Sequence, residues 1–355
     1  MSALQKLPRI AGVAGVGASI TALATQPSFL GYLSRTLGLQ VPGGAWKVAA
    51  IMLALLNLKN LPFMWHIRLF RALIYHIYFQ PTPIHPTALF QPIITSTRTP
   101  LVECDYNLHK SNSTYFSDID ISRTHLVTAL LRTGIKKASH ASHKKHHHGP
   151  EVPGEAVHEG SHLVALGAVA CCFKREIAPY EKFEIWTRLL TWDRKWMYLV
   201  SHLVKPGVVK PAHYTLQPWK RSKGRRDVSA EEEEKRKVQL KSAVFASSIA
   251  KYVVKKGRLT IHPEQVLMQA EMLPPKPDGW VYSADKSVPV NGESVEDAVL
   301  PAVIANSEEW DWNKIEKERL RGLRIAEMFA GLDGLHEEFD GGKNGALGEF
   351  ADLLW

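Results

Sequence analysis

Between Glu103 and His109 the sequence places a carboxylate, an amide and an imidazole at alternate positions, as Asp105, Asn107 and His109. In an extended segment, alternate side chains project from the same face. We therefore expect the segment Glu103–His109 to be extended and its three polar side chains to meet in one place. A carboxylate or an imidazole could act there as a general base on a carbonyl substrate, and a carboxylate could also act as a nucleophile.

The residues after this polar segment are predicted to form a helix that starts near Ser113. Ser111 and Asn112 are, like Ser113, suitable N-cap residues, and apolar residues recur at helical spacing as far as Leu130. Gly134 follows as a candidate C-cap. The first turn of a helix presents backbone N–H groups without an intrahelical acceptor, and these can stabilise a developing oxyanion. The polar segment would then lie beside an oxyanion-binding helix N-terminus.

The residues from Asp105 to Tyr115 form the motif Asp-x-Asn-x-His-x-x-Asn-x-x-Tyr, which resembles the signature of hotdog-fold thioesterases. Its first half is similar to acyl-carrier-protein thioesterases, and 4-hydroxybenzoyl-CoA thioesterases place a catalytic Asp similarly. The wider sequence is similar to a membrane-anchored subgroup, the thioesterase-superfamily-member-six type. Glu103 stands where many members have Asp, and Ser111 stands where they have the first of two Asn. The matching pieces cover roughly half of the chain and are WHIRLFR, DYNLH, NSTYF, FEIWTRLLTWDRKWMYLVSHLV and HPEQVL.

The resemblance implies an α+β hotdog fold, in which an antiparallel sheet wraps a long central helix, and a homodimer with acyl-CoA sites at its interface. It implies hydrolysis of an acyl-CoA or acyl-carrier thioester in lipid metabolism, with no metal and no organic cofactor. Asp105 would be the principal catalytic carboxylate, and His109 and Asn107 would be the other catalytic residues. The residues that would bind the substrate or the oxyanion are Asn112, Ser113 and Glu103, the last also a reserve carboxylate.

Each of these residues also has a purely structural interpretation. Asp105 could cap a turn or the helix, His109 could be a satisfied polar residue at a strand end, and Tyr115 is expected to pack on the helix face. Their combination directly before a helix favours catalysis. The alternative function is a membrane-anchored acyl-binding or scaffold protein with this fold and little turnover, and hydrolysis of acyl-CoAs of varied chain length would separate the two.

The net charge of +9 arises mainly from the first 102 residues. They contain eight Lys or Arg and no Asp or Glu, whereas the other 253 residues contain 36 basic and 35 acidic side chains. A basic, acid-free arm indicates a membrane or targeting role, and the nearly neutral remainder argues against nucleic-acid binding. The three cysteines are too few for a disulfide framework and indicate a reducing compartment; they are Cys104, Cys171 and Cys172.

Residues 1–79 are predicted to be an arm that associates with a membrane through residues 1–75. The run Ile10–Ala24 is weakly apolar, so a signal anchor, a transit peptide and a frayed helix all remain open. The run Val48–Trp65 is more apolar but contains Lys59. It could span a bilayer if that lysine reaches the interface, or it could lie on the surface as an amphipathic helix. The predicted location is an intracellular membrane, of the endoplasmic reticulum or the mitochondrion.

A proline-rich connector at 80–100 is predicted to lead into a hotdog domain at 101–272. The segment His162–Ile177 is apolar on both faces, as expected of a central strand. Asp193–Lys195 is typical of a hairpin turn, and Gln265–Met272 indicates a short helix. The predicted strands of the sheet are His162–Ile177, Phe183–Trp192, Trp196–Val204 and Val244–Ile261.

Two insertions, at 135–160 and 205–240, interrupt the predicted domain. The first contains a His-rich tract at 140–148, which could bind a metal ion. It lacks fixed spacing and a Cys or Asp partner, so a solvated loop is the favoured interpretation. The C-terminal extension at 273–355 is predicted to contain a helix near 307–339, with Ser307 as its N-cap, that packs on the domain.

Overall fold

The computed structural model describes residues 27–36, 38, 42–145, 162–208, 210–220, 238–274, 311–338, 347 and 349–351. The chain divides into two compact units, of which the first comprises Met1–Trp65 and Pro100–Val102. The second comprises His66–Thr99 and Glu103–Trp355. The run Ile10–Ala24, most of the second insertion, Ser307 and the side chains of the His-rich tract lie outside the described residues.

The described part of the first unit contains short helices, and the longest of these is α3 (Gly44–Leu56). It ends at Asn57, whose amide donates a hydrogen bond to the carbonyl oxygen of Leu53 at 2.8 Å. The run Val48–Trp65, for which the sequence leaves both a span and a surface helix open, is therefore not one continuous helix. None of the helices in the described part of the chain has the length and hydropathy required to cross a membrane. The other helical segments of this unit are α2 (Pro27–Thr36), η1 (Leu58–Asn60) and the beginning of η4 (Leu101–Glu103).

The second unit is built on one antiparallel sheet of six strands, in the order β1-β3-β4-β5-β2, with β6 paired to β5. Neighbouring strands run in opposite directions throughout. The strands are β1 (Ile93–Arg98), β2 (His162–Phe173), β3 (Lys182–Trp192), β4 (Trp196–Val204), β5 (Val244–Lys256) and β6 (Leu259–Ile261).

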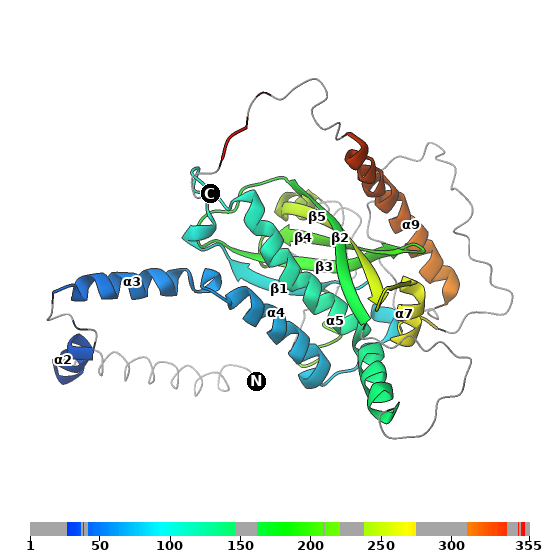
Figure 1. Cartoon of the computed structure of the whole chain (residues 1–355), viewed down its shortest axis with the longest axis horizontal. Coiled ribbons are helices and arrows are strands. Elements are labelled where there is room, and N and C mark those ends of the chain that lie inside the picture. The colour runs from blue at the N-terminus through cyan, green and yellow to red at the C-terminus, as the bar shows by residue number, and fades with distance from the viewer. Residues whose placement is uncertain are drawn as a thin grey trace, which may run out of the picture. The chain divides into compact units, whose positions relative to one another are not determined.

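The long helix α5 (Asn112–Lys145) lies along one face of this sheet, and α9 (Trp312–Ala330) packs against β3 (Figure 1). Alternate residues of a strand face opposite sides, so Leu189 of β3 joins the core cluster that contains residues of α5. Leu190 joins the cluster that contains residues of α9. The predicted α+β arrangement of a hotdog fold, a helix covered by an antiparallel sheet, is confirmed.

Helix α9 approaches the sheet closely because Gly322 has no side chain. A Cβ atom added there would lie 2.3 Å from the carbonyl oxygen of Leu190. Asp311 is the N-cap of this helix and accepts a hydrogen bond from the backbone N–H of Lys314 at 2.9 Å. The predicted packing of a C-terminal helix on the domain is confirmed, and its start is at Trp312.

The predicted strands occur where they were expected. Two features differ from the prediction, namely the place of β2 in the sheet and the presence of β1. β4 has the predicted bounds, and Asp193 shapes the β3–β4 turn by accepting from the N–H groups of Lys195 and Trp196 at 2.7 and 2.6 Å. β2, however, lies at an end of the sheet, where the central positions belong to β3, β4 and β5. β1 lies inside the segment predicted to be only a connector, because its short run between prolines pairs with β3.

Two further boundaries differ from the prediction because of tertiary contacts. α5 continues through Gly134, the predicted C-cap, and packs there against Ala270, whose backbone N would be in ordinary contact, at 3.5 Å, with an added Cβ. The segment Val244–Ile261 divides into β5 and β6 at Gly257, which has a positive φ of 59°. Further short helices described in this unit are α7 (Pro263–Gln269), η3 (Pro86–Ala88), η6 (Gly331–Glu338) and a segment at 238–243.

The last part of the predicted membrane arm, residues 66–79, belongs to the same unit as the sheet. From His66 onward, α4 (Met64–Ile74) and the π-helical turn η2 (Tyr75–Phe79) belong to the same unit as the sheet. The Nε2 atom of His76 lies 2.9 Å from Nδ1 of His125 on α5. Within this segment Arg68 and His76 contact α5, whereas Ile67, Phe70 and Tyr78 are exposed.

A buried chain of alternating charges connects α4, the segment before α5, and α5 itself. The Nζ atom of Lys110 forms an ion pair with Glu103 and lies 3.0 Å from Oδ2 of Asp118. The other oxygen of Asp118 accepts from Arg68 at 2.9 Å. The side chains of Lys110 and Asp118 are fully buried. Two cations and two anions thus compensate each other away from water, which makes each of them costly to remove.

We predict that Lys110→Met destabilises the protein by about 3–5 kcal/mol, because it leaves Glu103 and Asp118 buried without their shared cation. The matched control is Lys137→Met, which breaks a pair with Glu271 in which both side chains are more than half exposed. That change should cost less than about 1 kcal/mol. Urea unfolding of both variants measures the difference, and equal stability of the two variants would contradict the structural role of Lys110.

Candidate active site

The segment predicted to be extended from Glu103 to His109 is a tight turn, and that prediction is wrong. The side-chain oxygen Oδ1 of Asp105 accepts hydrogen bonds from the backbone N–H groups of Asn107 at 2.9 Å and His109 at 3.4 Å. Leu108 has a positive φ of 59°. A short carboxylate that binds backbone N–H groups two to four residues onward stabilises a turn in place of a strand.

Both ends of this turn are fixed beside the N-terminus of α5. Cys104 and Lys110 form an isolated antiparallel bridge. The N–H of Lys110 donates to the carbonyl oxygen of Ile177 at 2.9 Å, and the N–H of Ser111 donates to that of Glu103 at 2.8 Å. The buried side chain of Lys110 is anchored to α5 through Asp118. The turn is therefore a rigid platform at the start of the helix.

The turn holds Asp105 and His109 but does not bring the three predicted catalytic side chains together. Asp105 is half-buried, and Asn107 is exposed at the tip, where its only hydrogen bond among the described residues is made by its backbone. The Nε2 atom of His109 lies 2.9 Å from Oε2 of Glu176, and the histidine side chain is 36% exposed. Glu176 lies in the segment after β2, and no sequence motif identified it.

The predicted oxyanion-binding residues lie where the helix begins. Asn112 is the first residue of α5, and Asn112 and Ser113 are both exposed. The hydroxyl of Ser113 lies 3.2 Å from that of Ser111. Glu103 has a different place, because it is only 3% exposed and is paired with Lys110. Its buried side chain anchors the turn through Lys110, so it does not lie at the surface of the site.

Tyr115, near the start of α5, packs against its neighbours as expected. Its side chain is buried, and its ring makes an edge-to-face contact with Phe173 at a centroid distance of 5.0 Å. Burial raises the pKa of Tyr115 to about 12, and the nearby groups of Cys171, Glu176 and Asp105 add to the shift. The phenol is therefore neutral at physiological pH.

The chemistry available here is acid–base chemistry beside a helix N-terminus. The turn offers a carboxylate and a His–carboxylate pair, and the adjacent helix terminus offers N–H donors for an oxyanion. Among the described residues, no group of His, Cys, Asp and Glu side chains has an arrangement that could hold a metal ion. Lys110, Asp118 and Arg68, which fix this arrangement, were missed from the sequence; the one available signal was a carboxylate, Asp118, within the apolar face of α5.

Comparisons with known proteins place the same region in a family. The model of the thioesterase-like superfamily matches residues 100–231, which include the turn and the whole of α5. The chain is 35% identical over 322 residues to thioesterase poxG of Penicillium oxalicum, a match that covers 85% of this chain and 92% of that protein. It is also 35% identical over 313 residues to the probable thioesterase atnL of Emericella nidulans, a match that covers 86% of this chain and 92% of that protein.

Among solved structures, BH1999 gentisyl-coenzyme A thioesterase aligns with 50% of this chain and 99% of its own, at 16% identity and a TM-score of 0.29. The matches to these two relatives cover nearly the whole length of each relative. By this similarity, the chain belongs to the thioesterase-like superfamily.

Proposed function

We propose that this protein hydrolyses a thioester at the N-terminus of α5. The observation that carries the proposal is the turn that fixes Asp105 and the His109–Glu176 pair directly before the first turn of that helix. The fungal relatives are named thioesterases, which supports the same reaction class. Acyl-CoA and acyl-carrier thioesters are the proposed substrates, because their thiol leaves readily and a strong general acid is not required.

In the proposed reaction, a water molecule attacks the thioester carbonyl carbon while a base takes one of its protons. The carbonyl oxygen becomes an oxyanion that the N–H groups at the start of α5, near Asn112 and Ser113, would stabilise. The carbon–sulfur bond then breaks, the sulfur leaves as a thiolate that takes up a proton, and the acyl group is released as a carboxylic acid. No electron transfer and no cofactor enters this balance.

Two groups are candidates for the base. Asp105 uses Oδ1 to hold the turn, and its Oδ2 atom makes no hydrogen bond within the described part of the chain, so that oxygen is available to water. His109 has Glu176 as a partner, and a carboxylate that orients an imidazole is a common arrangement for a histidine base. We propose Asp105 as the principal base and His109 as the residue that orients water or shares the proton transfer.

We predict that Asp105→Asn lowers the turnover of a long-chain acyl-CoA by at least about 100-fold, because it removes the charged base. The amide retains an oxygen that can accept the two turn hydrogen bonds, so the circular dichroism spectrum should not change. His109→Ala should have a smaller effect if the histidine only orients water. Glu271→Gln, an exposed site near α7, is the control. Equal turnover of wild type and Asp105→Asn would remove Asp105 from the mechanism.

The second candidate function is acyl binding without useful turnover. The observation that favours it is that Asp105 already has a structural role, as the cap of the turn. Steady-state hydrolysis across acyl-CoA chain lengths separates the two functions. Absence of hydrolysis at every chain length, together with saturable binding of acyl-CoA, would identify the protein as an acyl-binding protein of the same superfamily.

We propose that the first unit contacts a membrane surface through α3. The side chains of Leu53 and Leu56 are 58% and 50% exposed, and the first 102 residues contain basic but no acidic side chains. Exposed apolar side chains near basic ones are typical of segments that lie on anionic bilayers. This proposal accounts for the resemblance to a membrane-anchored subgroup by association with the membrane surface. It does not require a membrane-spanning helix.

We predict that the full-length protein floats with vesicles that contain anionic phospholipid. Leu53→Glu combined with Leu56→Glu should reduce the bound fraction at least about tenfold, because two charged side chains replace apolar ones that the bilayer would bury. The control is Leu259→Glu, which alters a leucine of β6 that is 43% exposed. Wild-type protein that stays entirely with the unbound fraction would exclude this surface association.

We propose a homodimer that pairs the β2 strands of two copies. β2 lies at one end of the sheet, and its outer edge has no strand partner among the described residues. It carries exposed apolar side chains, with Leu163 61% exposed and Leu166 44% exposed. An open apolar strand edge is unfavourable unless another chain covers it.

We predict that light scattering at micromolar concentration gives the mass of two chains for wild type and of one chain for Leu163→Lys combined with Leu166→Lys. The added lysines would lie near their symmetry mates and repel them. Leu259→Lys serves as the control, since β6 is paired on β5, away from that edge. A monomeric wild type would contradict the dimer.

A further inference from the structure

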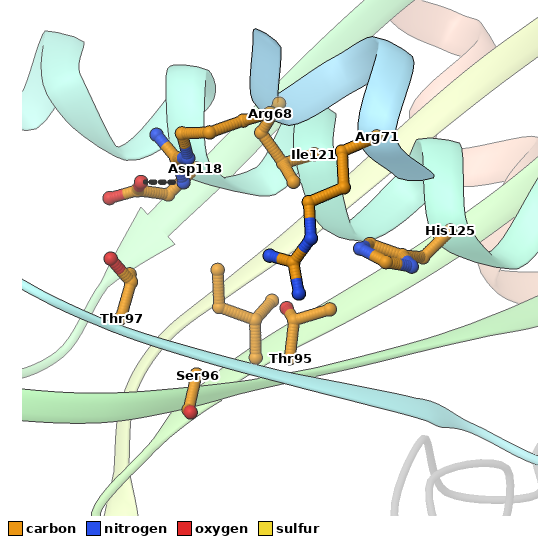
Figure 2. Close-up of a pocket in the computed structure, with 9 residues that line it drawn as sticks. Arg68, Arg71, Thr95, Ser96, Thr97, Asp118, Ile121 and His125 are labelled. Carbon is orange, nitrogen blue, oxygen red and sulfur yellow. Dashed lines mark hydrogen bonds and ion pairs between the residues drawn. The ribbon is translucent and has the colours of Figure 1, made fainter. Parts of the chain in front are cut away.

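A pocket of about 130 Å³ lies between α4, β1 and α5, within the second unit (Figure 2). Apolar side chains are a minority of its lining. The polar side chains that matter for its chemistry are Arg68, Arg71, Thr95, Thr97, Asp118 and His125.

The regular spacing of these residues explains why they meet. Arg68 and Arg71 are three residues apart on α4, and residues at this spacing share a helix face. Thr95 and Thr97 occupy alternate positions of β1 and therefore project to the same side, about 7 Å apart. Asp118 and His125 are two helical turns apart on one face of α5. Three elements from different parts of the sequence thus each contribute one polar face.

The two arginines of the pocket differ in their charge balance. Arg68 donates to Oδ1 of Asp118 at 2.9 Å, so its charge is compensated. Arg71 forms no hydrogen bond or ion pair within the described part of the chain. Figure 2 shows its guanidinium group directed from α4 toward Thr95 of β1. The pocket therefore contains one uncompensated guanidinium group next to hydroxyl donors.

His125 does not supply a second positive charge. Its Nδ1 atom lies 2.9 Å from Nε2 of His76, so its ring is held in a fixed orientation. Burial lowers the pKa of His125 to about 4, and the charges of Arg71 and Arg68 add to the shift. The other charged group of the pocket is Asp118, and β1 and β3 contribute no titratable side chain to its lining. At neutral pH the imidazole is uncharged, and the excess charge of the pocket belongs to Arg71.

We propose that this pocket binds an oxyanion, a phosphate or carboxylate group, held by Arg71 and by the hydroxyls of Thr95 and Thr97. A guanidinium group matches the planar or tetrahedral oxygens of these anions through two parallel N–H donors. Asp118 and His125 lie about 9 and 20 Å along α5 from Asn112, at 1.5 Å per residue. The pocket is thus separate from the proposed site of hydrolysis, and anion binding does not depend on turnover.

The anion could be a phosphate of a thioester carrier, a carboxylate, or a free ion, and three probes distinguish these sources. Full-length protein with isotope-labelled histidine would be titrated with inorganic phosphate, acetate and coenzyme A, with binding followed by calorimetry and by the NMR signal of His125. An anion beside Arg71 offsets the charge that lowers the pKa of His125, so bound anion should raise that pKa. Coenzyme A that binds more tightly than both small ions would assign the pocket to the carrier, and acetate that equals phosphate would assign it to carboxylates.

Arg71→Gln should weaken binding of the effective probe about tenfold to a hundredfold, the usual effect of losing hydrogen bonds to a charged group. Without any anion, the same change should raise the pKa of His125, because a nearby positive charge is removed. Arg258→Gln, which removes an equal charge from the exposed turn between β5 and β6, is the control and should bind like wild type.

Two results would overturn the proposal. One is that none of the three anions alters the His125 signal of the wild-type protein. The other is that Arg71→Gln binds the effective probe within about twofold of wild type. Anion binding in a protein without thioester hydrolysis would count against the proposed function and leave the pocket assignment supported.

Discussion

The structure around the start of α5 depends on the burial of Lys110 between two carboxylates. A lysine ammonium group is stable away from water only where opposite charges compensate it, and here Glu103 and Asp118 do so from the turn and from the helix. Arg68 then balances the second carboxylate from α4. Because the four charges must lie together, the turn, α4 and α5 have a fixed arrangement. The polar groups displayed by the turn take their positions from this buried chain.

In the same region, local hydrogen bonds form the turn and tertiary contacts fix its position. Asp105 binds the N–H groups of Asn107 and His109, so the turn can form from its own residues. What holds it beside the helix is its anchoring to Ile177 and to Asp118. Rigid support of this kind is what a hydrolytic site requires, since a base and an oxyanion donor are effective only in a fixed relative position. It also explains why Asp105 has both a structural and a proposed chemical role.

The pocket beside α4 uses the other end of the same charge chain. Asp118 compensates Arg68 and leaves Arg71, one turn further along α4, without a partner in the described part of the chain. Arg68 and Arg71, which share one face of α4, thus have different electrostatic environments. Oδ1 of Asp118 contacts Arg68, and its Oδ2 contacts Lys110.

The sequence by itself determined several of the elements and the family resemblance. The hydrophobic alternation predicted β3, β4 and the β3–β4 turn, and the helical spacing predicted α5, because these patterns depend on local geometry and on burial of one face. The motif from Asp105 to Tyr115 indicated the thioesterase superfamily, to which the chain belongs. The structure shows that the motif is a turn held by Asp105, a local preference that the alternation of polar residues did not reveal. The tertiary structure alone decided that β2 lies at the end of the sheet and that Glu176 pairs with His109. Those outcomes rest on contacts between residues far apart in the sequence, and a single sequence records the residues without recording which of them meet.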